Sequence, residues 1–70
     1  MLVKRTDLIK QITRAAQEAG VLFELHREGG SHTVYKINGL SLPIPRHREI
    51  NERTAQSILA DAMKQIGDTP

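Results

Sequence analysis

The chain has no cysteine and no tryptophan, and only one phenylalanine and one tyrosine. The absence of cysteine excludes disulfides, a thiolate nucleophile and thiolate-bound metals, and it favours a reducing, cytoplasmic compartment. Two aromatic side chains are too few for a sheet that stacks successive RNA bases on aromatic rings. Long apolar runs are also missing, and the N-terminal MLVKRTD segment becomes charged too early for a signal peptide or a spanning helix. We therefore expect no membrane partner.

Charge of one sign is not abundant either, since 10 Lys and Arg side chains against 8 Asp and Glu leave a net charge of +2. The run Arg46-His47-Arg48 is the local exception, and it predicts either an anchor for a polyanion or a solvated loop. At 70 residues the chain is expected to form one domain, residues 1–70, whose small core leaves no room for a large enclosed site. The three histidines are scattered without ligand spacing, so we expect neither a metal site nor a cofactor.

Apolar residues at helical spacing predict two helices, one near each end of the chain. The first is expected to be capped by Thr6 or Asp7 and to end at Gly20. The second is expected to be capped by Asn51 and to end at Gly67. The predicted stripes are Leu8, Ile9, Ile12, Ala15, Ala16 and Ala19 in the first helix, and Ala55, Ile58, Leu59, Ala62, Met63 and Ile66 in the second.

Strand-like sequences occupy the region between the two helices. Asn38-Gly39 predicts a two-residue type I′ turn, because both positions of that turn need positive φ. Pro43 and Pro45 suit an edge strand, where a missing backbone donor does no harm. The order α-β-β-β-α predicts an α+β fold with both helices on one face of a three-stranded antiparallel sheet. The strands are expected at about residues 21–28, 31–37 and 40–45.

The alternation of apolar residues assigns one face of this sheet to the core. Phe23 and Leu25 reach that face if a three-residue loop, Glu28-Gly29-Gly30, carries a glycine in the left-handed conformation. The same register places His26 opposite His32 on the open face. The core face is then completed by Thr33, Tyr35, Ile37, Leu40, Leu42 and Ile44, and the open face carries Glu24, His26, His32, Lys36 and Ser41.

One candidate for proton transfer stands at the start of the second strand. The sequence Gly29-Gly30-Ser31-His32 places a histidine directly after a flexible turn. An imidazole can both accept and donate a proton near neutral pH, so this position suits acid-base chemistry, with a solvated surface histidine as the alternative. Ser31 is expected to shape the turn, because no histidine-carboxylate relay that would activate it is visible.

Three segments, taken in order, resemble HicA-type toxins. They are GGSHTVYK across the first hairpin, LPIPRHREI around the end of the third strand, and TAQSILADA in the second helix. The resemblance extends from Leu8 to about Ile66. It implies a small messenger-RNA-cleaving protein with a fold like a double-stranded-RNA-binding domain, paired with a HicB-type antitoxin. In that family the histidine after glycine-serine is the catalytic one, and it maps onto His32.

Together the residues and the resemblance predict an endoribonuclease toxin, an mRNA interferase that cleaves RNA without a metal through His32. His26 and Ser31 are candidate assisting groups, with plain structural roles as the alternative. The alternative functions are a non-catalytic double-stranded-RNA-binding module and an interaction subunit with an inactive site. The candidate RNA-binding side chains are Arg27, Lys36, Arg46, His47 and Arg48, whereas Lys4, Arg5, Lys10 and Arg14 are expected to form a solvated helix face.

Overall fold

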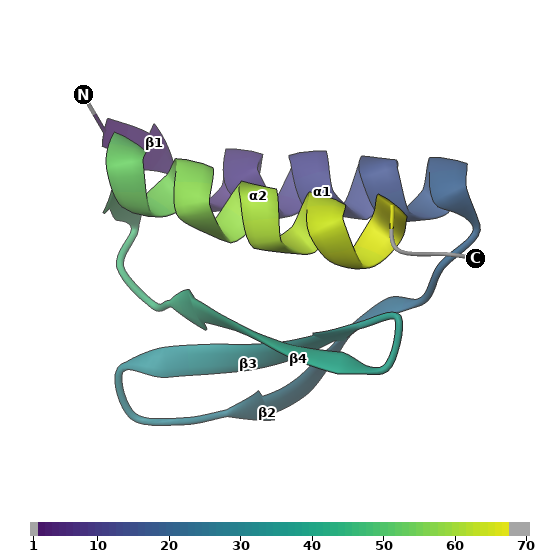
Figure 1. The fold of residues 1–70 in the computed structure, drawn as a ribbon. Helices are drawn as coiled ribbons and strands as arrows, with labels where there is room; N and C mark the ends of the chain where they lie inside the picture. The colour runs from purple at the N-terminus through teal and green to yellow at the C-terminus, as the bar shows by residue number, and fades with distance from the viewer. Residues whose placement is uncertain (1, 68–70) are drawn as a thin grey trace.

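The computed structural model describes residues 2–67, and the other residues of the predicted domain, Met1 and residues 68–70, lie outside the described part. Two helices lie side by side across one face of a three-stranded antiparallel sheet of order β2-β3-β4 (Figure 1). This arrangement confirms the predicted α+β fold. The elements are β1 (Leu2–Lys4), α1 (Arg5–Ala19), β2 (Phe23–Glu28), β3 (His32–Ile37), β4 (Leu40–Pro45), β5 (Glu49–Asn51) and α2 (Glu52–Gly67).

Helix α1 ends as predicted but begins earlier. Gly20 follows it with φ of 72°, in the left-handed region, and its N–H bonds back to helix carbonyls. The predicted caps Thr6 and Asp7 both lie inside the helix, which begins at Arg5. The N–H of Arg5 donates to the carbonyl oxygen of Arg48 at 2.9 Å. A backbone group from a distant segment therefore satisfies the first helical donor, in place of a capping side chain.

That distant segment belongs to two short strands that the sequence analysis did not predict. β1 and β5 pair antiparallel as a separate two-stranded sheet, with Val3 opposite the buried Ile50 and Lys4 opposite Glu49. Strands of three residues are too short for apolar periodicity to indicate them. Their pairing brings the start of α1 beside the start of α2, at one end of the molecule (Figure 1).

Helix α2 begins where the sequence predicts. The side-chain Oδ1 of Asn51 accepts a hydrogen bond from the N–H of Arg53 at 2.9 Å. Ala19 and Met63 depart from the predicted apolar stripes, because both are exposed, Met63 by 46%. The stripes otherwise face the core, and their buried residues are Leu8, Ile12 and Ala16 in α1 and Ala55, Ile58 and Ala62 in α2.

The β3–β4 hairpin follows the prediction closely. Asn38 and Gly39 have φ of 52° and 82°, as a type I′ turn requires, and Ile37 lies opposite Leu40. β4 is an edge strand, which confirms the interpretation of its prolines. Leu40 is an error in the predicted core face, since this residue beside the turn is 49% exposed. The buried side chains of this face are Thr33, Ile37, Leu42 and Ile44.

The β2–β3 turn corrects the prediction of a three-residue loop. The turn closes between Gly29 and His32, where the glycine N–H donates to the histidine carbonyl at 2.9 Å. Its tip is therefore Gly30-Ser31, and neither of the two glycines has positive φ. A two-residue tip alone would send the apolar side chains of β2 to the wrong face, because the side-chain period of a strand is two.

A β-bulge resolves this conflict. The register shifts between Leu25 and Arg27, so that Phe23 lies opposite Ile37 and Leu25 lies opposite Tyr35. The three-residue loop predicted Phe23 opposite Tyr35 and Leu25 opposite Thr33, each two residues away, but both apolar side chains keep the core face. Leu25 nevertheless remains 52% exposed on its edge strand, which makes its predicted burial wrong.

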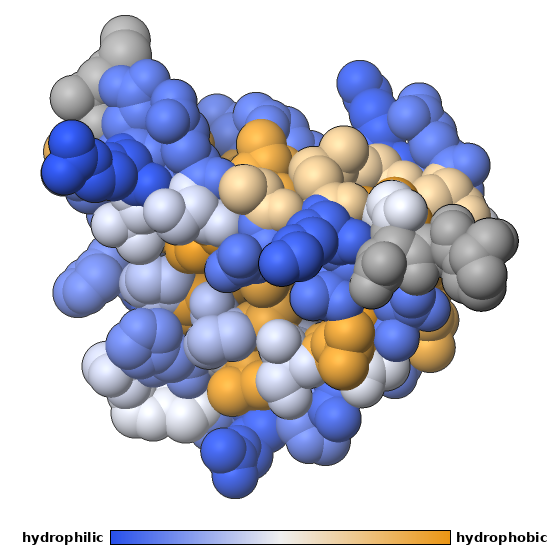
Figure 2. Space-filling view, viewed as in Figure 1, coloured by the Kyte–Doolittle hydropathy of each residue, from blue (hydrophilic) through white to orange (hydrophobic). Residues whose placement is uncertain are grey.

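Apolar side chains fill the space between the helix layer and the sheet, where orange surface is visible in Figure 2. The rings of Phe23 and Tyr35 stack with centroids 5.0 Å apart and an interplanar angle of 14°. Both pack against the buried core, which confirms the assignment of Tyr35 to packing. Within residues 2–67, no helix has the length and apolar character needed to span a membrane.

Candidate active site

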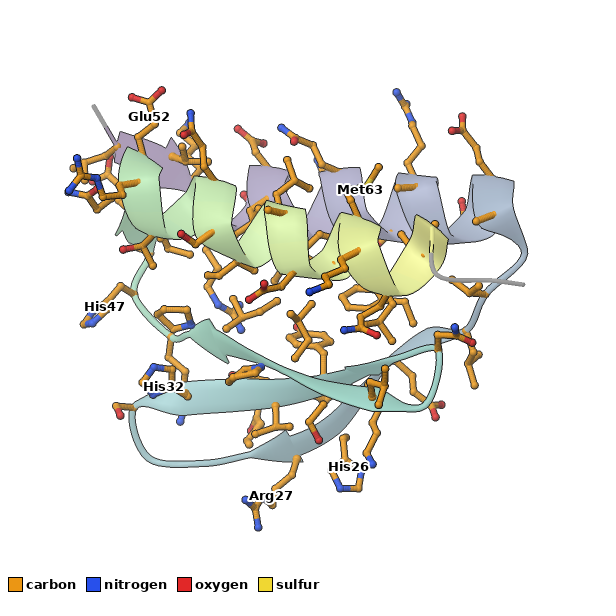
Figure 3. All side chains as sticks on the ribbon, viewed as in Figure 1. His26, Arg27, His32, His47, Glu52 and Met63 are labelled. Atoms are coloured by element: carbon orange, nitrogen blue, oxygen red, sulfur yellow. The ribbon has the colours of Figure 1, made fainter. Side chains whose placement is uncertain are left out.

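The predicted catalytic residue, His32, is the first residue of β3. It lies opposite Pro45 of β4, and its side chain is exposed at the end of the sheet where the β2–β3 turn lies (Figure 3). The backbone is held from two sides, by the pairing with Pro45 and by the hydrogen bond from Gly29. An exposed imidazole on a fixed backbone is accessible to a substrate as large as RNA.

The two glycines of the turn have different structural requirements. A Cβ at Gly29 would lie 3.1 Å from the carbonyl oxygen of His32, closer than ordinary van der Waals contact. A Cβ at Gly30 would meet no heavy atom within 4 Å. A side chain at the first position would therefore force a small shift between the two strands, whereas the second position has room for one.

Ser31 contacts the imidazole directly. Its Oγ and the Nδ1 of His32 are 3.1 Å apart. A hydroxyl can donate to an unprotonated Nδ1 or accept from a protonated one, so this contact is compatible with either tautomer. When Nδ1–H donates to the serine oxygen, the neutral ring presents an Nε2 lone pair that can accept a proton, and the doubly protonated ring presents an Nε2–H that can donate one. The predicted turn-shaping residue thus also orients the ring.

Arg46 ties the turn to the segment after β4. Its Nη1 lies 3.2 Å from the carbonyl oxygen of Gly29 and 3.5 Å from that of Gly30. Its backbone N–H also donates to the carbonyl oxygen of Ser31 at 3.1 Å. The sequence offered Arg46 only as an RNA-binding residue, whereas these contacts hold the turn that carries His32. Other N–H groups of the guanidinium remain available for an anion, because arginine has five donors.

His26 is not brought to His32, and the predicted cross-strand pair is wrong. The bulge lies at His26, and on the side of β2 it is Gly29 that bonds to His32. In Figure 3 the side chains of His26 and Arg27 point away from the helices, whereas His32 lies at the turn end of the sheet. The original reason for an assisting role of His26 is therefore absent.

The bulge also changes which cations face outward from the sheet. Arg27 lies opposite Val34, and Lys36 lies between Glu24 and Ser41, so both cations occupy the open face. The other two candidates, His47 and Arg48, are exposed in the segment that joins β4 to β5. The predicted RNA-binding residues thus form two groups, one on the sheet and one beside the turn of His32.

Sequence reasoning missed two further cations of the second group. Lys4 and Arg5 were expected on a solvated helix face, but the β1–β5 pairing places them beside Arg46 and Arg48. The Nε of Arg5 donates to the carbonyl oxygen of Pro45 at 2.9 Å. Only knowledge of the β1–β5 pairing would have revealed this cluster. Within residues 2–67, no group of three or more His, Cys, Asp or Glu side chains is placed to hold a metal ion.

Comparison with known protein families identifies the relationship. The family described as the HicA toxin of bacterial toxin-antitoxin systems matches residues 9–67. The chain belongs to the HicA toxin family. No curated protein and no solved structure matches it. The part of this HicA toxin that matches the family includes His32 and Arg46, whereas Lys4 and Arg5 precede it.

Proposed function

We propose that this HicA toxin is an endoribonuclease that cleaves messenger RNA through His32 without a metal ion. The observation that carries the proposal is the exposed imidazole of His32, with its Nδ1 3.1 Å from a serine hydroxyl and the Arg46 guanidinium bonded to the same turn. Cleavage of a phosphodiester requires a group that moves protons and positive charge for the phosphate, and both are available here.

In the proposed reaction the 2′-hydroxyl of one nucleotide attacks the adjacent phosphorus. The bond from phosphorus to the 5′ oxygen of the next nucleotide breaks, which yields a 2′,3′-cyclic phosphate and a 5′-hydroxyl end. His32 removes the proton of the 2′-hydroxyl or donates one to the departing 5′ oxygen. Neighbouring cations stabilise the negative charge that increases on the phosphate oxygens. No oxidant, reductant or cofactor enters this balance.

A second proton-transfer group makes the reaction more efficient, because one step needs a base and the other an acid. His26 does not serve this role in the proposal, since it lies at the bulge of β2. His47 is better situated: it is exposed, it follows Arg46, and Figure 3 shows it at the same end of the molecule as His32.

The proposed partner is a HicB-type antitoxin that covers the exposed end of β3. RNA and an antitoxin cannot occupy the same surface, so coverage of His32 is sufficient for inhibition. Hydrogen exchange tests this: the amides of residues 29–33 should exchange more slowly in the complex than in the free toxin. An interface that left these amides unprotected would contradict the proposed mode of inhibition.

The first experiment is cleavage of a long messenger RNA in EDTA by the wild type, His32→Ala and His26→Ala. We expect the wild type and His26→Ala to produce the same fragments, and His32→Ala to be slower by a factor of about 10² or more. His26→Ala is the matched control, because it removes the same imidazole from the same sheet.

A second readout tests the chemistry. A 2′-deoxy nucleotide at the cleaved position should block the reaction, and mass spectrometry should detect 2′,3′-cyclic phosphate ends. Equal cleavage by His32→Ala would refute the assignment. RNA binding without cleavage by the wild type would favour the double-stranded-RNA-binding module instead.

A further inference from the structure

A basic cleft lies beside the turn of His32, on the side of β1 and β5. Its volume is about 580 Å³. Four of its lining side chains are cationic and one is a carboxylate, which makes it strongly positive for a protein whose total net charge is +2. The lining residues are Lys4, Arg5, Thr6, Arg46, Arg48 and Glu49.

Backbone contacts fix the walls of this basic cleft. Lys4 and Glu49 are opposite each other in the β1–β5 ladder, and the N–H of Arg5 bonds to the carbonyl of Arg48 at 2.9 Å. The part-buried Nε of Arg5 donates to Pro45 at 2.9 Å. The fold therefore holds the cations together, although the sequence separates them into two segments about forty residues apart, as in the pair Arg5 and Pro45.

The basic cleft adjoins the candidate active site directly. Pro45, which accepts the hydrogen bond from Arg5, is also the strand partner of His32. Arg46 lines the cleft and donates to the carbonyl oxygen of Gly29 in the turn of His32. Arg46 thus connects the turn that carries the imidazole with the cationic lining of the cleft.

We infer that the basic cleft binds phosphate groups of the RNA strand next to the phosphate that is cleaved. This inference rests on the proposed ribonuclease function and names a binding site for its substrate. Arginine presents a planar set of donors that fits phosphate oxygens, and lysine adds a flexible point charge. Lys4 and Arg48 are both exposed, so their side chains can turn toward a bound strand. The carboxylate of Glu49 also lines the cleft and repels anions, but the four cations that line the same space outweigh it.

The test measures binding of a short fluorescein-labelled single-stranded RNA by anisotropy over a range of salt concentrations. All proteins carry His32→Ala so that the RNA stays intact. The cleft variant is Lys4→Ala with Arg48→Ala. The matched control is Lys10→Ala with Arg14→Ala, which removes the same two charges from exposed positions along α1, in a separate hollow that also contains Asp7. Circular dichroism confirms that each variant is folded.

We expect the cleft variant to bind more weakly and to lose about 1.4 from the slope of log Kd against log salt, because each phosphate contact on single-stranded RNA contributes about 0.7. The control variant should keep the slope of the parent protein. Equal slopes in the two variants would overturn the inference. The inference would also be overturned if the cleft variant kept the RNA slope of the parent protein but lost binding to a polyglutamate peptide. That result would assign the cleft to an acidic protein segment.

The cleavage assay distinguishes this inference from the proposed function. Cleavage that depends on His32, together with identical slopes in the cleft and control variants, would leave the ribonuclease intact and remove the cleft from its substrate site. A reduced slope in the cleft variant, together with no cleavage by the wild type, would keep the cleft as an RNA-binding site and reject the nuclease.

Discussion

Removal of the Arg46 guanidinium should slow RNA cleavage much more than it destabilises the fold. Its Nη1 makes one hydrogen bond of 3.2 Å to the turn and a longer contact of 3.5 Å. A net contribution of about 0.5–1.5 kcal/mol is typical of one such bond, so Arg46→Ala should cost about 1 kcal/mol. Thermal unfolding followed by circular dichroism should then show a Tm lower by about 4–8 °C.

The effect on catalysis should be larger, because the turn carries the imidazole. A displacement of about 1 Å in a reacting group costs on the order of 10²-fold in rate. We therefore expect kcat of Arg46→Ala to fall by about 10- to 100-fold with KM changed much less. Arg46→Lys keeps the positive charge but lacks the planar fork of donors, so we expect its kcat to stay low while its KM is close to that of the wild type.

Arg48→Ala is the matched control for this prediction. Arg48 is an exposed arginine of the same segment, and its carbonyl, not its side chain, makes the hydrogen bond to Arg5. Its removal should raise KM and leave kcat close to that of the wild type. The positioning role would be refuted if Arg46→Lys recovered the kcat of the wild type, or if Arg46→Ala and Arg48→Ala gave the same kinetic pattern.

Four other substitutions have expected outcomes. Gly29→Ala places a Cβ 3.1 Å from the carbonyl oxygen of His32, so it should lower the free energy of unfolding by about 1 kcal/mol and slow cleavage. Gly30→Ala places a Cβ with nothing within 4 Å, so it should match the wild type in urea unfolding and in RNA cleavage. Asn51→Ala removes the side-chain cap of α2 and should lower the free energy of unfolding in urea by about 1 kcal/mol with kcat unchanged, so an unchanged urea midpoint would contradict the cap. His26→Ala should leave kcat within about 2-fold, and a larger loss would return His26 to the reaction.

The sequence predicted correctly those features of the fold that depend on a single residue and its neighbours. The Asn38-Gly39 turn, the Asn51 cap and the Gly20 helix end each depend on one residue type in one backbone conformation, and all three are confirmed. The register of β2 could not be predicted in this way. A three-residue loop and a bulge in β2 combined with a two-residue tip both deliver Phe23 to the core face, and the sequence contains no local signal that selects between them.

The part of the site that distant segments form together also could not be predicted from the sequence. Residues 2–4 and 49–51 pair across most of the chain, and each strand is too short to show periodicity. Without this pairing, the sequence indicates only an ordinary residue of a solvated helix at Arg5. With it, Arg5 supports the basic cleft, and the carbonyl oxygen of Arg48 accepts from the Arg5 backbone N–H in place of the predicted cap.

The position of Arg46 has a consequence for inhibition. Arg46 contacts the turn of His32 and lines the basic cleft, so the two parts of the proposed RNA site meet at one exposed side chain. A protein that binds over Arg46 therefore blocks the imidazole and displaces the neighbouring phosphates together. It needs no distortion of the core, because the turn is held by exposed contacts at one end of the sheet. We expect an antitoxin that inhibits by covering the site to protect Arg46 more strongly than any other residue of the site. Arg46→Ala should also weaken the binding of that antitoxin.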